Sequence, residues 1–270
     1  MRVVILPSEL EASDFAAKLI CEFISHKENA VLGLATGSST VLTYKVLIEQ
    51  CKKEQISFKK VSTFNLDEYI GLGPNHTQSY RHYMDSKLFN HIDINKKNTY
   101  IPECFNNEFA LSCNNYESMI NNHGGIDIQV LGIGTNGHIG FNEPTSSLNS
   151  RTRVKTLTEN TIKYNSRFFD KTEIQPKLAI TMGIGTIMEA KQIILLGLGK
   201  HKSKAIADTV EGPITSFCPA SILQQHSDVV VVIDEHAASE LKLYDYYIHT
   251  EKMHQWKISF SFQGQPIQEI

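Results

Sequence analysis

The sequence lacks a long hydrophobic run. No apolar stretch approaches the ~18 residues that a membrane-spanning helix requires. The apolar part of the first segment, MRVVILPSEL, is also too short for a secretory signal peptide. Net charge is low as well, because 26 Lys and Arg stand against 29 Asp and Glu. This near balance gives no broad attraction to nucleic acid or to an anionic membrane, so we expect a protein that binds neither. From the lack of a signal peptide and of a membrane span, we expect it to be cytoplasmic.

Cysteine is scarce, and its pattern excludes two further classes of protein. The five cysteines are an odd number, are widely scattered and form no C-x-x-C pair: Cys21, Cys51, Cys104, Cys113 and Cys218. A disulfide framework and a structural zinc site are therefore disfavoured, and a reducing compartment is expected. Metal-ligand spacing is absent from the sequence too, so we expect no metal.

The chain does contain short apolar runs that alternate with helical patterns. The predicted strands are Arg2–Leu6, Ala30–Ala35, Val61–Phe64, Ile126–Gly132, Gln192–Leu198 and Asp228–Ile233. The first predicted helix starts with a capping box, and the others follow Thr40 or cover Ser79–Leu88, Ser203–Val210 and Ala237–Tyr247. This alternation predicts an α/β fold in one domain over residues 1–270. We expect an open, mainly parallel sheet with helices on both faces, in a modified Rossmann-like arrangement.

Ligands of such sheets bind beyond the carboxyl ends of the strands, so the loops there hold the candidate site. The loop GLATGSST follows the second strand and leads into a helix. Its Gly37, Ser38 and Ser39 offer backbone N–H groups and hydroxyls that suit a phosphate. The loop lacks the Lys of a Walker motif, which argues against a nucleoside triphosphate. The alternative is a strand-to-helix turn of small residues without a ligand.

Two adjacent acids follow the third strand in STFNLDEYIGL. A carboxylate at this place, such as Asp67, can act as a general base if its pocket partly desolvates it and raises its pKa. The alternative is that Asp67 and Glu68 only cap the next turn.

The segment VLGIGTNGHIGFNEP has glycines in G-x-G-x-x-G spacing after a strand, which is typical of dinucleotide binding. We reject that interpretation because Pro144 would interrupt the long helix that the motif should open. Polar side chains also crowd the supposed helix start, and no strand ending in an acid follows at the distance that ribose binding requires.

We predict instead that this glycine-rich loop presents His138 and Glu143 as an acid–base pair. A histidine titrates near neutral pH, and a nearby carboxylate orients its ring and stabilises its charged form. The alternative is a structural histidine. Two basic residues, Arg167 in NSRFFD and Lys202 in GLGKHKSKA, are further candidates for binding an anion. For them the alternative is a solvated surface position.

Five motifs together resemble one enzyme family. GLATGSS, FNLDEYIGL, GTNGHIGFNEP, SRTRVKTLT and NSRFF occur in the order, and nearly with the spacing, of the glucosamine-6-phosphate deaminases. The resemblance extends from the first strand to Leu243, and the tail at 244–270 diverges from the family pattern. The 6-phosphogluconolactonases and the sugar-binding domains of some bacterial repressors share the fold without the pair FNLDEY and GHIGFNEP.

The resemblance implies conversion of glucosamine 6-phosphate and water to fructose 6-phosphate and ammonia, in amino-sugar catabolism and without a metal or organic cofactor. It implies that Asp67 moves a proton between C2 and C1 of the sugar, and that His138 assists ring opening with Glu143 as its partner. Asn136 stands where many members have Asp; it can orient the ring but cannot stabilise imidazolium as an anion would. The residues implied to hold the phosphate are Gly37, Ser38, Ser39, Arg167 and Lys202.

The resemblance also implies an allosteric site for N-acetylglucosamine 6-phosphate at a subunit boundary of a homo-oligomer, often a hexamer. Its residues lie in the segment SSLNSRTRVKT: Ser146, Arg153, Lys155 and Thr156. Two cations two residues apart can hold a phosphate. The alternative is an exposed edge strand, on which alternating basic residues discourage association.

Two other functions compete with deamination. A lactonase of the same fold would not need Asp67 to take a proton from carbon. A sugar-phosphate-sensing regulator would require a DNA-binding module before the sugar domain, whereas the first predicted strand begins at Arg2. We therefore expect the deaminase.

Overall fold

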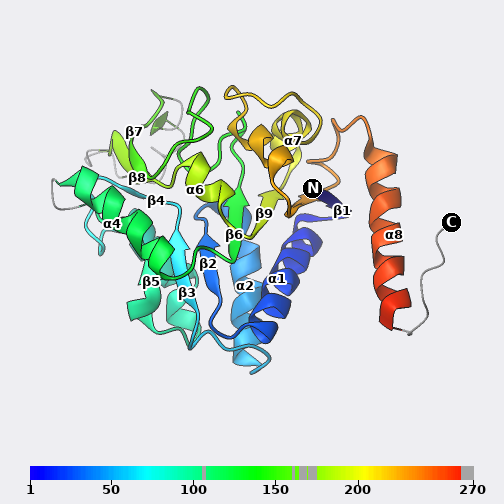
Figure 1. Cartoon of the computed structure of the whole chain (residues 1–270), viewed down its shortest axis with the longest axis horizontal. Helices are drawn as coiled ribbons and strands as arrows, with labels where there is room; N and C mark the ends of the chain where they lie inside the picture. Colours follow the sequence, from blue (N-terminus) through cyan, green and yellow to red (C-terminus); the bar gives the residue numbers. More distant parts are fainter. Residues whose placement is uncertain (105–107, 160–161, 164–168, 170–174, 263–270) are drawn as a thin grey trace.

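A seven-stranded parallel sheet forms the centre of the molecule. The computed structural model describes residues 1–104, 108–159, 162–163, 169 and 175–262, with side chains of the last helix up to Trp256. Every pairing in the sheet is parallel. Its spatial order is β1 (Arg2–Leu6), β10 (Val229–Asp234), β9 (Gln192–Gly197), β6 (Ile128–Gly132), β2 (Val31–Leu34), β3 (Ser62–Asn65) and β5 (Thr99–Tyr100) (Figure 1).

Helices cover both faces of this sheet, as the sequence predicts. The α-helices are α1 (Glu9–His26), α2 (Ser38–Lys52), α3 (Tyr80–Lys87), α4 (Phe109–Asn122), α6 (Ile184–Met188), α7 (Ser203–Val210) and α8 (Tyr244–Phe262). Short 3-10 helices cover Phe89–His91, Lys96–Asn98, Lys200–Lys202 and Pro219–Gln225. The buried residues of α1, α2 and α3 share one hydrophobic cluster, and those of α4, α6 and α7 share another.

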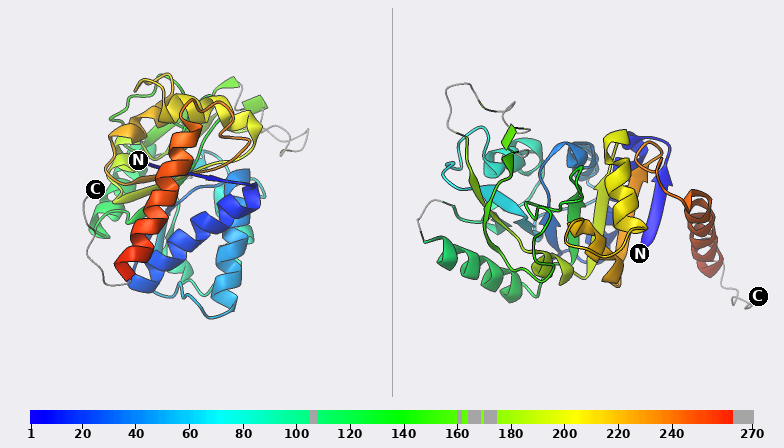
Figure 2. Two further views of the ribbon diagram at one scale, coloured as in Figure 1. Left: turned by 90° about the vertical axis from the view of Figure 1, so that its right-hand side faces the viewer. Right: turned by 90° about the horizontal axis from the view of Figure 1, so that it is seen from above.

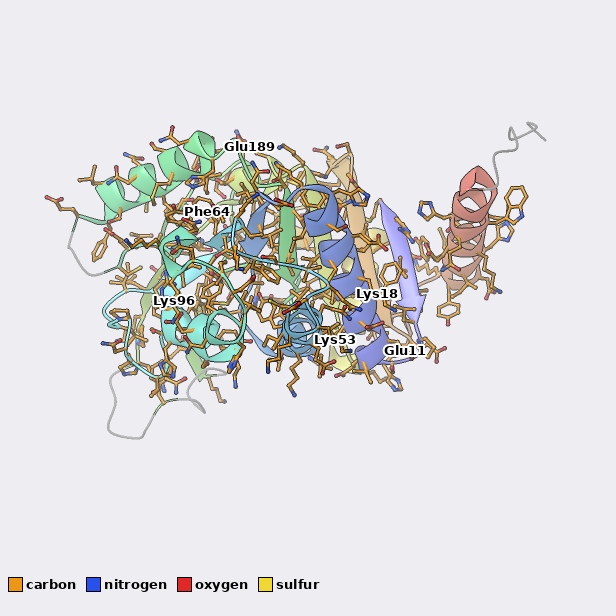
Figure 3. The ribbon with its side chains drawn as sticks, turned by 90° about the horizontal axis from the view of Figure 1, so that it is seen from below. Glu11, Lys18, Lys53, Phe64, Lys96 and Glu189 are labelled. Carbon is orange, nitrogen blue, oxygen red and sulfur yellow. The ribbon has the colours of Figure 1, made fainter. Side chains whose placement is uncertain are left out.

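Alternation along the strands separates these two clusters. On β10, Val229, Val231 and Ile233 pack in the cluster of α4 and α7, whereas Val230 and Val232 pack in the cluster of α1 and α2. Because both faces are covered, a strand such as VVVVID is apolar up to its last residue, Asp234, which is typical of a buried parallel strand. Charged side chains such as Lys18 on α1 point outward into solvent (Figure 3).

A small antiparallel sheet was not predicted from the sequence. Its strands lie in the order β4 (Asp67–Tyr69), β8 (Leu178–Thr181) and β7 (Arg153–Thr156). Asp67 on one outer strand and Arg153 on the other both pair with Thr181 on the central strand. The edge strand that the sequence offered as an alternative for the basic segment is therefore present, as β7.

The six strands predicted for the parallel sheet are confirmed, with ends that differ by at most two residues, but two helix starts are wrong. The second helix begins at Ser38, ahead of Thr40. The predicted helix at 237–247 begins only at Tyr244, and turns precede it. Side chains hold those turns: the Asp234 carboxylate accepts from the Ala237 N–H at 2.8 Å, and Glu211 accepts from the N–H groups of residues 242 and 243 at 2.9 Å.

The helix α8 forms the described part of the tail and lies beside β1 at one edge of the molecule (Figures 1 and 2). A bidentate ion pair joins the two, because the Arg2 guanidinium donates to both carboxylate oxygens of Glu251 at 2.8 and 2.6 Å. Among the helices that the structure describes, none combines the length and the apolar character needed to cross a bilayer.

Candidate active site

A pocket of about 440 Å³ opens at the carboxyl ends of β2, β3 and β6. The strand order changes direction there, between β2 and β6: β3 and β5 follow on one side, and β9, β10 and β1 lie on the other. Open α/β sheets bind ligands at such a switch point. The wall combines small, polar and aromatic residues: Ala35, Thr36, Gly37, Ser38, Ser39, Leu66, Asp67, Tyr80, Gly132, Ile133, Gly134, Thr135, Asn136, His138, Gly140, Phe141 and Lys202.

One end of the pocket is suited to an anion. The helix α2 begins there, and its N-cap Gly37 has a φ of 112°, a conformation that favours glycine. The first N–H groups of the helix therefore face the pocket beside the Ser38 and Ser39 hydroxyls. Lys202 lies on the same side, where burial lowers the pKa of its ammonium group. No hydrogen bond or ion pair within the described part of the chain engages that ammonium, so it is available to an incoming anion.

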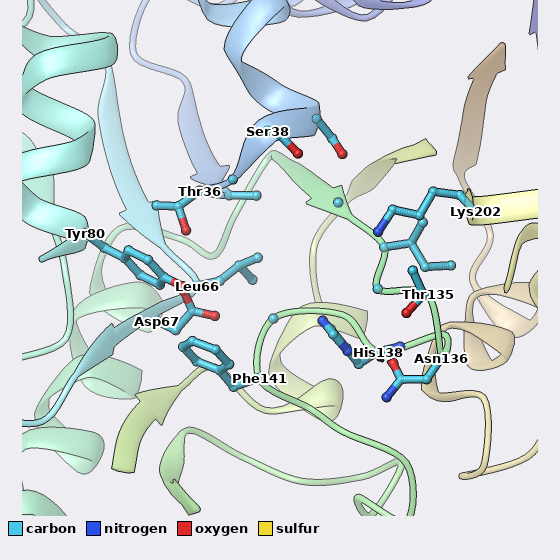
Figure 4. A pocket seen from close by; sticks show the side chains of 17 residues that line it. Thr36, Ser38, Leu66, Asp67, Tyr80, Thr135, Asn136, His138, Phe141 and Lys202 are labelled. Atoms are coloured by element: carbon cyan, nitrogen blue, oxygen red, sulfur yellow. Dashed lines mark hydrogen bonds between the residues drawn. The ribbon is translucent and has the colours of Figure 1, made fainter. Parts of the chain in front are cut away.

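A buried carboxylate occupies the opposite side (Figure 4). Asp67 is 5% exposed. Burial, reinforced by the neighbouring Glu68 carboxylate, raises the pKa of Asp67 to about 8, although a backbone hydrogen bond from Phe141 acts in the other direction. The group therefore takes up and releases a proton near neutral pH, as a general base must.

His138 reaches the same space through a chain of hydrogen bonds. Its Nδ1 lies 2.7 Å from Asn136 Oδ1, and Asn136 Nδ2 donates to Glu143 Oε2 at 2.9 Å. Because the amide oxygen can only accept, Nδ1 carries the hydrogen, and Nε2 of the neutral ring is left as an acceptor. Glu143 is buried behind the ring, with Oε2 at 3.4 Å from Nδ1. A Cβ at Gly134 would lie 2.2 Å from the imidazole, so the ring needs glycine there.

An aromatic wall beside Asp67 was not anticipated from the sequence. The ring of Tyr80 stacks on Phe141 with centroids 5.9 Å apart and an interplanar angle of 11°. Its hydroxyl donates to the Tyr69 hydroxyl at 3.3 Å. The position of Tyr80 directly after the Ser79 N-cap signals a helix start, but no spacing in the sequence connects it with Asp67.

The structure brings most of the predicted site residues together. Those lining the pocket are Gly37, Ser38, Ser39, Asp67, Asn136, His138 and Lys202, with Glu143 directly behind them. Arg167 lies outside the described residues. Among the residues described, no group of three or more His, Cys, Asp or Glu is placed to hold a metal ion.

The four residues predicted for an effector site do not line this pocket. Ser146 is 2% exposed, while Thr156 is exposed on β7. Arg153 and Lys155 are half-buried on the same strand, and their spacing of two places them on one face of it. The Arg153 guanidinium also donates to Asn142 Oδ1 at 2.9 Å, which links the edge strand to the loop of His138.

The pocket lies where α/β enzymes bind small ligands, and one end of it suits an anion. The comparisons identify the family. Residues 9–232 match the model of the glucosamine-6-phosphate isomerases/6-phosphogluconolactonases. The chain belongs to this family. It is 53% identical over 255 residues to a glucosamine-6-phosphate deaminase of Shewanella woodyi, covering 94% of this chain and 97% of the relative. The same identity and coverage hold for a glucosamine-6-phosphate deaminase of Cellvibrio japonicus.

Solved structures agree with this assignment. A protein described as a monomeric glucosamine-6-phosphate deaminase superimposes with a TM-score of 0.86 at 44% identity, covering 89% of this chain and 100% of that one. A 6-phosphogluconolactonase from Trypanosoma cruzi superimposes with a TM-score of 0.71 at 21% identity, covering 89% and 97%. The second likeness shows the fold alone.

Proposed function

We propose that this chain converts glucosamine 6-phosphate and water to fructose 6-phosphate and ammonia. One observation carries the proposal: a buried carboxylate that titrates near neutral pH, Asp67, faces an anion cradle across a pocket that also holds His138. An aldose–ketose shift needs a base at carbon, an acid–base group at the ring oxygen and a clamp on the phosphate. The relatives are named for the same substrate and for removal of its amino group.

In this mechanism the phosphate binds first and fixes the sugar. The N–H groups at the start of α2, the Ser38 and Ser39 hydroxyls and the Lys202 ammonium all donate to its oxygens. His138 Nε2 then takes the proton of the anomeric hydroxyl, the bond between C1 and the ring oxygen breaks, and the ring oxygen is protonated. Asn136 and Glu143 hold the imidazole in the required tautomer and orientation.

Asp67 acts on the opened chain. As its anion, it removes the proton at C2 of the amino aldehyde, giving an enolamine, and a proton returned to C1 gives the imine of fructose 6-phosphate. Water adds to the imine carbon, and ammonia leaves. The raised pKa makes Asp67 a stronger base than an ordinary carboxylate, because the barrier to proton transfer falls as the pKa of the base rises.

An ammonia-release assay on glucosamine 6-phosphate tests the function. We expect turnover with this substrate and very little with glucosamine, which lacks the phosphate. Hydrolysis of 6-phosphogluconolactone without release of ammonia from the amino sugar would favour the lactonase. Binding of sugar phosphates without either reaction would favour a regulatory domain.

The cradle gives a prediction for Lys202→Ala. We expect KM for glucosamine 6-phosphate to rise by roughly 10- to 150-fold, the equivalent of about 1.5–3 kcal/mol for a hydrogen bond to a charged group, with a small change in kcat. Lys200→Ala is the matched control, because Lys200 is exposed on the same 3-10 helix. Equal KM values in the two variants would place the phosphate elsewhere.

We propose further that the chain acts in the cytoplasm, and that β7 carries an effector site for N-acetylglucosamine 6-phosphate at a boundary in a homo-oligomer. The five free cysteines support a reducing compartment. The shared face of Arg153 and Lys155 supports the anion site. A hexamer is our particular expectation, although one solved relative is described as monomeric, so sedimentation of this chain is the deciding measurement.

Substrate-saturation curves with and without the acetylated sugar phosphate test the effector site. We expect the effector to raise substrate affinity by no more than the usual range of allosteric coupling, which is about 5- to 150-fold. Lys155→Ala should remove this response and leave the basal curve unchanged. Arg153→Ala should also alter the basal curve, because it loses the hydrogen bond to Asn142. A wild-type curve that does not respond to the effector would make the basic pair an ordinary edge-strand feature.

A further inference from the structure

A second buried carboxylate lies next to the proposed base but faces away from the pocket. Glu68 is 1% exposed and follows Asp67 on β4. Side chains of neighbouring strand residues point to opposite sides, so Asp67 faces the pocket while Glu68 faces α3. The mechanism above gives Glu68 no part in the chemistry, although burying a carboxylate is costly.

The partners of Glu68 are backbone groups at the start of α3. Its Oε1 accepts from the N–H groups of Tyr69 at 2.8 Å and Tyr80 at 2.9 Å, and its Oε2 accepts from the N–H of Arg81 at 3.0 Å. The Ser79 hydroxyl accepts from the next helical N–H, that of His82, at 3.0 Å. Glu68 thus satisfies the first two N–H groups of α3 from a different element. Burial raises the pKa of its carboxyl, whereas these N–H groups, the Arg81 guanidinium and the helix dipole favour its anion.

This arrangement fixes two walls of the pocket to each other. Tyr80 is the first residue of α3 and contributes the aromatic wall, while Asp67 precedes Glu68 on the strand. The pair of hydrogen bonds from Tyr80 N–H and Arg81 N–H to one carboxylate therefore sets where the Tyr80 ring lies relative to the Asp67 carboxylate. Figure 4 shows Asp67 and Tyr80 adjacent on one side of the pocket.

We propose that Glu68 is a positioning residue for the reaction proposed above. Its carboxylate anchors the first turn of α3 to β4, and this anchor holds Tyr80 against Asp67 and keeps water away from the base. The proposal rests on the proposed function, since it assigns Glu68 a part in the proton transfer at Asp67.

Glu68 also influences the charge of Asp67. Of the groups around Asp67, burial raises the pKa of the Tyr80 and Tyr116 phenols and of the Cys104 thiol, so these remain neutral. Glu68 is the neighbouring anion, and its charge adds to the effect of burial on the pKa of Asp67. Within the part of the chain that the structure describes, the titratable and charged groups around Asp67 are therefore Glu68, Tyr80, Tyr116, Cys104, His138 and, across the pocket, Lys202.

The test compares Glu68→Gln with Ser79→Ala. Glutamine keeps the size and one acceptor oxygen but removes the charge and places an NH₂ group against the Arg81 N–H. We expect kcat/KM on its high-pH plateau to fall on the order of tenfold through misplacement of the site. The acid limb of its pH profile should move down by roughly one pH unit, because a nearby anion is lost. Hydrogen–deuterium exchange in the first turn of α3 should accelerate.

Ser79→Ala removes a different cap of the same helix and leaves the Glu68 charge in place. It should accelerate exchange in α3 without moving the acid limb. The proposal is overturned if Glu68→Gln has the wild-type kcat/KM plateau, acid limb and hydrogen–deuterium exchange in α3. It is also overturned if Ser79→Ala moves the acid limb as far as Glu68→Gln does. If the wild type releases no ammonia, the proposed function fails instead, and the exchange measurement still decides whether Glu68 holds α3.

Discussion

Asp67→Asn is expected to lower kcat by a factor on the order of 10³ or more, while binding of glucosamine 6-phosphate is kept. Asparagine has nearly the same shape but cannot accept a proton from carbon, and general-base catalysis contributes about 10²–10⁴ to a rate. The direct measurement is exchange of the substrate C2 hydrogen in deuterated water. Exchange at the wild-type rate in Asp67→Asn would show that another group moves this proton.

The pH dependence of the stability of the same variant independently checks the raised pKa of Asp67. Asp67 has a pKa of about 8 in the folded protein, against ~3.9 in an unfolded chain. Between these two pH values, Asp67 therefore holds a proton in the folded protein that it has lost in the unfolded chain. The stability linked to that proton is complete below pH ~4 and is lost as pH rises through about 8. Asparagine does not titrate, so the stability of Asp67→Asn relative to wild type should increase by up to about 1.4 kcal/mol per pH unit across this window.

His138→Gln is expected to lower kcat/KM on the order of 10²- to 10³-fold, because ring opening loses its acid–base group. The small fraction of substrate that opens in solution can still meet Asp67, so the residual activity should exceed that of Asp67→Asn. Saturation kinetics of both variants on glucosamine 6-phosphate provide the measurement.

His201→Gln is the matched control for His138→Gln, because His201 is exposed and does not line the pocket. It should behave as wild type. Equal losses in the two histidine variants, or no loss in His138→Gln, would mean that ring opening does not depend on the imidazole in the pocket.

The sequence predicts the parallel sheet well because most of its strands can be recognised locally, from a short run of apolar residues. A strand buried on both faces is mostly apolar, and most of the six predicted strands are built around such a run, for example VVIL in β1, IILLG in β9 and VVVVI in β10. The strand β4 of the small sheet has no such run. β4 reads DEY, with two acids in three residues, and it becomes a strand only because β8, distant in the sequence, supplies its hydrogen-bond partners.

The pocket is predictable in part for a similar reason. Gly37, Asp67, His138 and Lys202 stand in loops directly after predicted strands, so the rule for α/β sheets already places them at one edge. Tyr80 enters the site through the tertiary contact of α3 with Glu68. The role of Glu68 as a cap is also tertiary. The alternative from the sequence is that the two acids cap the next turn, whereas Glu68 caps α3, twelve residues further along the chain.

The helix α8 also has a consequence for aggregation. β1 ends the parallel sheet, and the outer side of an end strand is a template for pairing with another chain unless something covers it. α8 lies along β1 and is tied to it by the ion pair between Arg2 and Glu251. A helix cannot extend a sheet, so α8 shields this edge from strand addition. On heating, release of α8 before the core melts would open the edge and turn a reversible local unfolding into irreversible precipitation.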